Sequence, residues 1–318
     1  MLATTVEENL DAWAEATGGR ACLVNLSENH TFRIDRDDGR RFILRVHRPG
    51  YQTSDAIESE LAWIAALRRD AGLPVPVPLA GKDGRLLQHL SLGLDMPRAA
   101  VLFRFEAGRE PRESEDLEPL FARLGEIAAR LHRHAETFVL PAGFTRPSWS
   151  AAAVLDADGL WGDWRKAPNL TGRGHDILTA LDRRLRDDLA AYGTAGDRFG
   201  LIHADMRLAN ILVDGDAVTL LDFDDCGFCW FAYDFAAAVS FFEDSPAVPR
   251  LKAEWISAYT RIRPLSDADI AAMDTMLLLR RMALLAWIHS HSETELARTH
   301  ANGFAEGTVR MAEKYLAQ

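Results

Sequence analysis

The first hundred residues alternate between short apolar runs and polar turns, a pattern that is typical of strands. The runs lie at 21–26, 30–35, 41–46, 86–89 and 100–105. Turn dipeptides such as Asp38-Gly39 and Asp83-Gly84 separate them. The pattern therefore predicts an antiparallel sheet in this part of the chain.

One helical pattern interrupts these strands. Apolar residues over 57–64 recur at helical spacing, and Gly72, Leu73 and Pro74 follow as a stop signal. Asp55 and Glu58 have the spacing of a capping box at the start of this helix. We therefore expect a sheet with one helix in this region.

Helical patterns dominate after residue 106. Amphipathic stripes occur at 117–131 and 177–185, and two or three further helices are expected between 266 and 317. The segment 106–111 contains glycine and proline and is a candidate hinge. The chain as a whole is therefore predicted to be α+β.

A hairpin is predicted within the helical part. Residues 211–213 and 218–221 are short apolar runs, and the segment 214–216 between them has turn chemistry. A hairpin centred near residue 216 places Asn210 opposite Asp222. One amide and one carboxylate oxygen are a donor set that suits Mg²⁺, which keeps several water and phosphate ligands.

Asp205 precedes this hairpin in the chain. Its place on the entering loop would let it accept a proton from a substrate hydroxyl near the metal ion. A carboxylate for the nucleophile and oxygen ligands for a metal on the phosphates are what phosphoryl transfer requires.

The pattern His203-x-Asp205-x-x-x-x-Asn210 followed by Asp222 resembles the motifs of the aminoglycoside phosphotransferase and choline kinase superfamily. The longer segment HADMRLANILVDGDAVTLLDFDDCGFCWFAYDFA is similar to the branch that includes type II homoserine kinases and bacterial stress-response kinases. The resemblance implies that Asp205 is the catalytic base and that Asn210 and Asp222 bind the metal. It also implies that His203 buttresses the catalytic loop and that Asp234 braces it.

The same resemblance implies a protein-kinase-like fold with two lobes. The expected division is a β-rich, nucleotide-binding N-lobe over 1–106 and a helical C-lobe over 107–318, which carries the catalytic loop and the metal-binding hairpin. The expected cofactors are ATP and Mg²⁺.

The chain has neither a Walker A motif nor a G-x-G-x-x-G motif. Ser27 and Asn29 lie between two predicted strands, where the kinase fold has its phosphate-covering loop, although a polar hairpin turn is the simpler interpretation. Arg45 stands where kinases have a phosphate-binding lysine. Glu60 is the expected partner of Arg45, with Glu58 as the second choice.

The adenine is expected at the hinge. Backbone groups near Arg104, Phe105 and Glu106 would hold it, because these contacts do not depend on side chains.

The acceptor pocket is expected to include Arg207 of the catalytic loop, which is also a candidate catalytic residue. A cationic amino alcohol would suit the acidic residues here, and an amino acid would also need Arg207 or Arg281 for its carboxylate. Trp287 and His291 have the spacing of ordinary core and rim residues on a helix. The full set of further candidates is Asp224, Asp225, Trp161, Trp230, Arg281, Trp287 and His291.

The composition narrows the choice of partners. The chain has 318 residues, 36 basic and 47 acidic, for a net charge of −11. This balance argues against nucleic acid or an anionic membrane as a partner. The most apolar segment, within 276–288, is interrupted by Arg280 and Arg281, so it is not expected to span a membrane.

The cysteines Cys22, Cys226 and Cys229 are too few for a disulfide framework, and the N-terminus lacks an apolar signal-peptide core. Both features predict a cytoplasmic protein. Cys226 and Cys229 form a C-x-x-C pair, but no second pair accompanies them, so a zinc or redox site is not expected.

The leading prediction is transfer of the γ-phosphoryl group of ATP to a hydroxyl of a small molecule. Amino alcohols, hydroxy amino acids and aminoglycoside-like compounds are the acceptors considered. The alternatives are a Ser/Thr protein kinase of the stress-response type and a pseudokinase that binds nucleotide without turnover.

Overall fold

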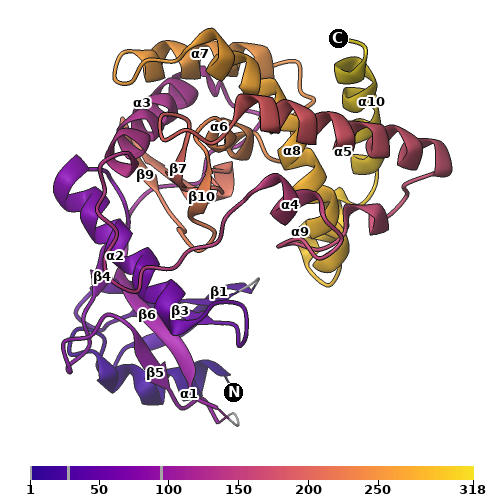
Figure 1. The fold of residues 1–318 in the computed structure, drawn as a ribbon. Helices are drawn as coiled ribbons and strands as arrows, with labels where there is room; N and C mark the ends of the chain where they lie inside the picture. Colours follow the sequence, from indigo (N-terminus) through magenta and orange to yellow (C-terminus); the bar gives the residue numbers. More distant parts are fainter. Residues whose placement is uncertain (1, 27–28, 94–95) are drawn as a thin grey trace. The chain divides into compact units, whose positions relative to one another are not determined.

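The computed structural model describes residues 2–26, 29–93 and 96–318 (Figure 1). Contacts between residues divide the chain into two compact units. The first unit comprises Met1–Arg109, Val139–Arg146 and Leu212–Asp224, and the second comprises Glu110–Phe138, Pro147–Ile211 and Asp225–Gln318. Each unit has its own core, and each is described separately below.

The first unit is built on an antiparallel sheet in the order β1-β2-β3-β6-β4, with β5 also paired to β6. Its strands are β1 (Arg20–Leu26), β2 (Asn29–Asp35), β3 (Arg41–His47), β4 (Pro78–Leu79), β5 (Gln88–Leu90) and β6 (Arg98–Arg104). The sequence predicted all of them except β4, which has only two residues and therefore shows no alternation.

The two faces of this sheet pack against different parts of the first unit. Phe32, Leu44 and Leu102 belong to a core formed with Leu10 and Trp13 near the N-terminus. These two residues lie in or beside η1 (Leu10–Ala12), which follows the helix α1 (Leu2–Asn9). The sequence analysis did not predict α1, because it is short and its single buried residue gives no periodic signal.

The opposite face packs on the predicted helix, which is α2 (Ser54–Ala71). Val101 and Phe103 form a second core with Ile57 and Leu61 of α2. Successive residues of a strand point to opposite faces. Ile43 of β3 packs on this second core, so Arg45 two residues later faces α2 as well.

The start of α2 differs from the prediction. Thr53 is the N-cap, and its side chain accepts a hydrogen bond from the backbone N–H of Ala56 at 3.2 Å. The predicted capping box of Asp55 and Glu58 is therefore wrong, because the helix begins at Ser54 and Asp55 lies within its first turn. The predicted end is confirmed, since Gly72 adopts a left-handed conformation (φ 56°) there.

The first unit also contains most of the predicted hairpin. The paired strands are β8 (Ile211–Asp214) and β9 (Ala217–Leu220), and Gly215 between them has a φ of 58°. Backbone hydrogen bonds join Val213 to Arg109 and Leu220 to Pro74. This hairpin is therefore anchored to the segments that follow β6 and α2.

The second unit is mainly helical. Its longer helices are α3 (Glu118–Ala135), α5 (Gly172–Tyr192), α7 (Val248–Thr260), α8 (Asp267–Ser290) and α10 (Phe304–Leu316). The shorter ones are α4 (Ala151–Leu155), α6 (Tyr233–Ala238), α9 (Glu295–His300), η2 (Trp164–Lys166) and η3 (Leu208–Asn210). A small antiparallel sheet of β7 (Phe199–Ile202) and β10 (Gly227–Trp230) was not predicted.

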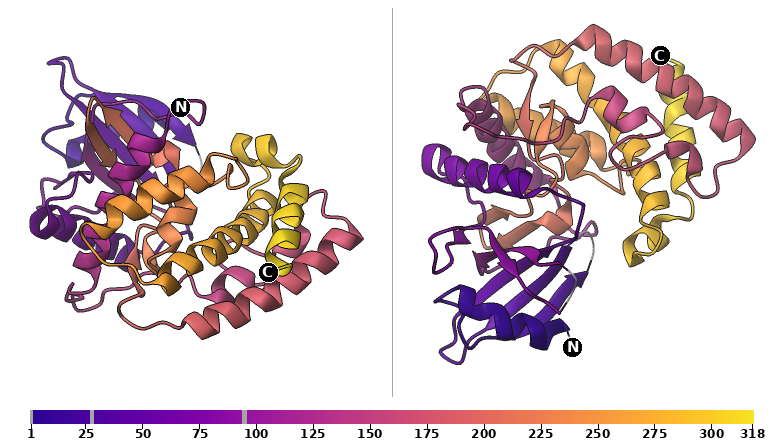
Figure 2. Two further views of the ribbon diagram at one scale, coloured as in Figure 1. Left: turned by 90° about the horizontal axis from the view of Figure 1, so that it is seen from above. Right: turned by 60° about the horizontal axis from the view of Figure 1, so that its bottom comes forward.

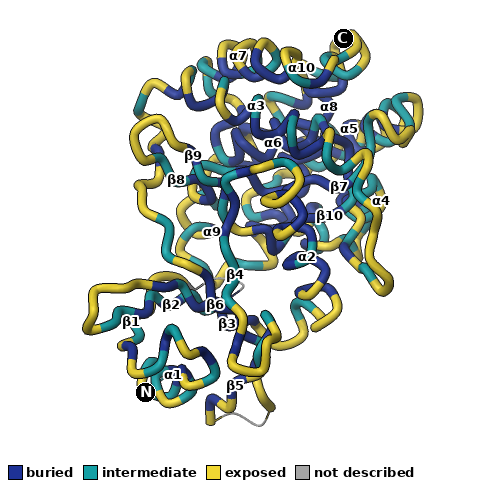
Figure 3. Tube along the Cα trace, turned by 90° about the vertical axis from the view of Figure 1, so that its left-hand side faces the viewer, coloured by how far each residue is buried: buried dark blue, intermediate teal, exposed yellow. Residues whose placement is uncertain are grey.

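Helix α8 lies at the centre of this unit. It packs against α5, α6 and α10 (Figure 2). Every residue from Thr275 to Ile288 is buried, and Figure 3 shows buried segments in dark blue around the label of this helix. Within the described residues, no helix is long and apolar enough to cross a membrane.

The α+β fold class is confirmed by the sheet-based first unit and the helical second unit. The lobe boundary between residues 106 and 107 stays a prediction. The compact units differ from it, since residues 107–109, residues 139–146 and most of the hairpin group with the first unit.

Candidate active site

Arg45 and Glu60 form a buried ion pair in the first unit. Nη2 of Arg45 lies 2.7 Å and 2.8 Å from the two carboxylate oxygens of Glu60. β3 directs Arg45 toward α2, and Glu60 lies on the face of α2 that packs on the sheet. Glu60 was the predicted partner, ahead of Glu58, which instead pairs with Arg85 at the surface.

The charges of this pair depend on each other. Burial raises the pKa of Glu60, and the charge of Arg45 opposes that effect. Burial alone would lower the pKa of Arg45, but the carboxylates of Glu60, Asp224 and Asp222 hold that pKa above its usual value. Arg45 is therefore a permanent cation in this unit.

Asp222 lies beside this cation. Its Oδ1 is 3.4 Å from Nη1 of Arg45, and its side chain is 47% exposed. The residue has a φ of 54°, a left-handed conformation that non-glycine residues adopt rarely. Such strain is found at functional sites, where surrounding contacts maintain it.

Asp224 anchors the segment that follows Asp222. Its Oδ2 accepts a hydrogen bond of 2.9 Å from Asn29, and its backbone carbonyl accepts bonds from Gln52 and Arg146. The Asn29 side chain also accepts a bond from the backbone N–H of Arg48. Asn29 therefore holds Asp224 in place, and its predicted contact with phosphate stays a prediction.

The other predicted nucleotide residues are placed as follows. Ser27 lies outside the described residues. Arg104 ends β6, and its backbone N–H bonds to the carbonyl of Val77. Neither Phe105 nor Glu106 makes a backbone hydrogen bond with another described residue. Backbone groups without such a bond are suited to hydrogen bonds with adenine, and the adenine contacts stay a prediction.

The second unit holds the catalytic loop. Oδ2 of Asp205 accepts a hydrogen bond of 2.7 Å from Nδ2 of Asn210 and lies 3.2 Å from Nε of Arg207. Asn210 Nδ2 also bonds to the backbone carbonyl of Asp205 at 2.9 Å. The short helix η3 brings Asn210 back to Asp205, so these three predicted residues lie together.

The loop is braced from behind by Asp234. Its two oxygens accept hydrogen bonds from the backbone N–H groups of His203, at 3.2 Å, and Ala204, at 2.8 Å. His132 bonds to the same carboxylate at 2.9 Å. Nδ1 of His203 in turn accepts a bond from the N–H of Asp205. The bracing roles predicted for His203 and Asp234 are therefore confirmed.

Arg280 was not predicted to be a site residue. Its Nη2 lies 2.5 Å from Oδ1 of Asp205, although the two residues are far apart in the chain. Burial alone would raise the pKa of Asp205, but the charges of Arg207 and Arg280 hold it below its usual value. The sequence did contain a signal for this contact. Two adjacent arginines lie in an apolar helix, and a buried charge needs a partner.

The adjacent Arg281 was predicted as an acceptor-binding residue, and its contacts show that this is wrong. It is 2% exposed and forms an ion pair of 2.8 Å with Glu243. It also bonds to Thr308 and to the carbonyl of Phe304. Its donors are therefore committed to holding α8, α10 and the segment before α7 together.

The tryptophan and histidine acceptor candidates have packing roles within the second unit. Trp230 donates to the carbonyl of Gly193, and Trp161 contacts Trp149 edge to face. Trp287 is buried and stacks on His291, as expected for core and rim residues. Cys226 and Cys229 are buried and not joined by a disulfide. Burial raises the pKa of the Cys229 thiol, so it is not a reactive thiolate.

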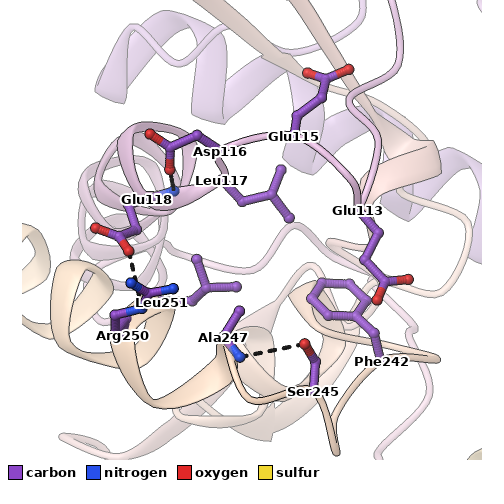
Figure 4. A pocket seen from close by; sticks show the side chains of 10 residues that line it. All are labelled: Glu113, Glu115, Asp116, Leu117, Glu118, Phe242, Ser245, Ala247, Arg250 and Leu251. Atoms are coloured by element: carbon purple, nitrogen blue, oxygen red, sulfur yellow. Dashed lines mark hydrogen bonds and ion pairs between the residues drawn. The ribbon is translucent and has the colours of Figure 1, made fainter.

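A pocket of about 380 Å³ lies elsewhere in the second unit (Figure 4). Carboxylates of Glu113, Glu115, Asp116 and Glu118 stand around it, and Leu117, Phe242 and Leu251 are its apolar part. Arg250 pairs with Glu118 at 3.2 Å. None of the predicted site residues that the structure describes lines this pocket.

The described residues contain no group of three or more His, Cys, Asp and Glu side chains that could hold a metal ion. A magnesium ion with phosphate and water ligands needs fewer protein ligands than that. The predicted pair of Asn210 and Asp222 supplies only oxygen, which fits magnesium. Nδ2 of Asn210 is taken by Asp205, which leaves its Oδ1 as the atom for a metal.

Comparison with known proteins agrees with this chemistry. Residues 24–266 match the model of the phosphotransferase enzyme family. A homoserine kinase of Rhodospirillum rubrum is 32% identical over 83% of this chain and 78% of its own length. An amicoumacin kinase of Bacillus subtilis is 23% identical over 83% of this chain and 78% of its own length.

Solved structures extend this similarity to the fold. A microcompartment-associated aminopropanol kinase is 39% identical, covers 99% of this chain and 97% of its own, and superposes with a TM-score of 0.90. The amicoumacin kinase hAmiN, in complex with AMP-PNP and Ca²⁺, has a TM-score of 0.76 at 19% identity, over 92% of this chain and 88% of its own.

These relatives are small-molecule kinases, so they do not favour the alternatives of a protein kinase or a pseudokinase. The chain belongs to the phosphotransferase enzyme family, and it is a kinase that uses ATP to phosphorylate a hydroxyl of a small molecule.

Proposed function

We propose that the acceptor is a small amino alcohol, of which aminopropanol is the leading case. The observation that carries the proposal is the 39% identity to the aminopropanol kinase over nearly the whole length of both chains. A resemblance of this extent covers both units.

The contacts of the arginines support an acceptor that has no carboxylate. A hydroxy amino acid such as homoserine would need a cation to bind its carboxylate. Arg281 is committed to Glu243, and Arg280 is 1% exposed and paired with Asp205. Arg207 is partly exposed but lies against Asp205. An amino alcohol makes no demand on any of these residues.

The catalytic roles are assigned to residues of this chain. Asp205 accepts the proton of the acceptor hydroxyl, and its lowered pKa keeps it ionised at neutral pH. Arg45 contributes a permanent positive charge for the phosphates, with Glu60 to orient it.

Asn210 and Asp222 would hold Mg²⁺, which neutralises phosphate charge during transfer. Asn210 belongs to the second unit and Asp222 to the first, so their joint role rests on the motif. The location of the enzyme in the cytoplasm likewise stays a prediction.

The test is Mg²⁺-dependent ADP release from ATP in a coupled assay. The panel contains aminopropanol, ethanolamine, choline, homoserine, an aminoglycoside and a generic protein substrate. We expect the highest kcat/KM with aminopropanol. A homoserine kcat/KM more than about tenfold higher would make a hydroxy amino acid the acceptor, because that ratio is about 1.4 kcal/mol of transition-state binding.

Asp205→Asn is the control for the chemical step. It retains the shape of the side chain but removes the base, so kcat should fall by about 10²- to 10⁴-fold. ATP binding, measured by calorimetry, should persist. Unchanged kcat in this variant would contradict the assignment of Asp205 as the base.

A further inference from the structure

Arg280 donates hydrogen bonds to two residues of the catalytic loop and to one serine. Nη2 bonds to Oδ1 of Asp205 at 2.5 Å, and Nη1 bonds to the carbonyl of Ala204 at 3.2 Å. Nε bonds to the hydroxyl of Ser240 at 2.9 Å. The guanidinium lies over the rings of Trp161 and Tyr233, so its plane is constrained as well as its donors.

Stability alone does not account for this arrangement. A buried ion pair is weak support for a fold, because desolvation of the two charges offsets most of their attraction. Arg280 is 1% exposed, in a helix whose other buried residues are mostly apolar. An apolar side chain would fill the same space at no greater cost. A role for the guanidinium therefore has to be sought in what it contacts.

The contacts of Asp205 show what Arg280 determines. An ionised carboxylate has about four lone-pair sites, two on each oxygen. Oδ2 already accepts from Asn210 and lies against Arg207, so both of its sites are used. Among the described residues, Oδ1 accepts from Arg280 alone, so one site remains on Oδ1.

The backbone of the loop is held by the same side chain. Ala204 has a φ of 67°, which is costly for a residue with a Cβ. Its N–H donates to Asp234, and its carbonyl accepts from Arg280. The strained residue directly before Asp205 is thus fixed from both sides.

We propose that Arg280 is a positioning residue that orients Asp205 so that Oδ1 is the atom that accepts the hydroxyl proton. The inference rests on the proposed role of Asp205 as the base. The guanidinium itself touches neither the acceptor nor the nucleotide in this assignment. Its effect is to fix the rotation of the carboxylate and the loop that carries it.

The test compares Arg280→Ala with Arg281→Ala. The two residues are neighbours in α8, both are buried, and both pair with a carboxylate. Both variants should lose thermal stability. Arg280→Ala should also lower kcat by about 10²-fold, the typical cost of a misplaced catalytic group, with little change in the KM for ATP. Arg281→Ala should retain kcat within about threefold, because Arg281 contacts no residue of the loop.

Rescue by free guanidinium separates positioning from stability. Added guanidinium at concentrations below those that unfold the protein should raise the kcat of Arg280→Ala at least about tenfold, and should not raise that of Arg281→Ala. A kcat of folded Arg280→Ala within threefold of the parent, or equal responses of the two variants, would overturn the proposal.

If Arg280→Ala does not fold, Arg280→Lys tests whether the guanidinium positions Asp205. Lysine retains the charge, but its single ammonium cannot reproduce three bonds in a fixed planar fork. A drop in kcat of about tenfold or more supports positioning by the guanidinium. A kcat within threefold of the parent shows that charge alone suffices and overturns the proposal.

A double-variant cycle distinguishes this inference from the function on which it rests. If Arg280 acts through Asp205, then Arg280→Lys should cause no further loss of kcat in Asp205→Asn. The same fractional loss in both backgrounds would contradict the inference while leaving the base in place. Full activity of Asp205→Asn would instead contradict the proposed base.

Discussion

Two of the buried arginine–carboxylate pairs involve predicted site residues. Arg45 with Glu60 is buried in the first unit, and Arg280 with Asp205 is buried in the second. Each pair joins side chains from different elements, so each depends on the packing that brings those elements together. Loss of one partner leaves a buried charge without compensation, which is far more costly than loss of an exposed pair.

Glu60→Gln should therefore destabilise the protein by about 3–5 kcal/mol, because Arg45 would stay buried and lose the carboxylate of its shortest ion pair, at 2.7 Å. Urea unfolding measures this difference. Glu58→Gln on the same helix is the matched control, since Glu58 pairs with Arg85 at the surface and should cost at most about 1 kcal/mol. Equal losses of unfolding free energy in the two variants would mean that burial does not set the contribution of the Arg45–Glu60 pair to stability.

Ala204→Gly tests the strain in the catalytic loop. Glycine adopts a positive φ freely, while alanine at φ 67° costs about 1–2 kcal/mol. The entropic cost of glycine, about 0.5–1 kcal/mol, offsets part of the gain. We expect a net stabilisation of up to about 1 kcal/mol by thermal or urea unfolding. Ala236→Gly within α6 should destabilise, and loss of stability in both variants would argue against strain at Ala204.

At the scale of elements, the packing of α3 on α7 depends on a glycine. A Cβ added at Gly125 would lie 2.5 Å from the backbone carbonyl oxygen of Trp255. Real Cβ atoms do not approach so closely, so the two helices would have to move apart. The Phe121 and Trp255 rings that meet between them would then lose contact.

Gly125→Ala should therefore destabilise the protein by about 1–3 kcal/mol, as other overpacked cores do. Gly172→Ala is the matched control at the start of α5, where an added Cβ would meet nothing within 4 Å. This second change should stabilise by about 0.4–1 kcal/mol, because alanine restricts the unfolded chain. Opposite signs in calorimetry would confirm that helix contact, and not helix propensity, decides the effect.

At the scale of the whole molecule, the buried His47 makes the free energy of unfolding depend on pH. His47 is 2% exposed, and its two ring nitrogens have no hydrogen-bond partner among the described residues. Burial lowers the pKa of His47 to about 2, and the charges of Arg45, Arg146 and Arg98 act in the same direction. The folded protein therefore keeps this imidazole neutral, while the unfolded chain protonates it near pH 6.5.

Below pH 6.5 the unfolded state binds the extra proton, so stability falls as the pH is lowered toward 2. The loss is about 1.4 kcal/mol for each pH unit, or about 2 kcal/mol between pH 6.5 and pH 5. His47→Met removes the titration, so its unfolding free energy should fall less over this range. In the difference between the two unfolding free energies, the contribution of the carboxylates that both proteins share cancels. Parallel pH profiles would contradict the assignment.

The fold and the site differ in how far they follow from local patterns. The strands of the first unit and the helix α2 were predicted because alternation and helical spacing are properties of neighbouring residues. β4, β7 and β10 have two to four residues each, which is too short for a period, and α1 has one buried residue. The capping residue Thr53 was missed because a competing cap pattern begins two residues later.

The sequence by itself determined the class of reaction, because the motif that indicates it is defined by spacing along the chain. Asp205, Asn210 and Arg207 were placed together correctly, and so were Arg45 and Glu60. Only the tertiary structure decided the partners of Arg280 and Arg281. The two are adjacent in the chain, but a helix turns by about 100° per residue, so they meet different neighbours. One pairs with the catalytic loop and the other with Glu243, and no local pattern distinguishes them.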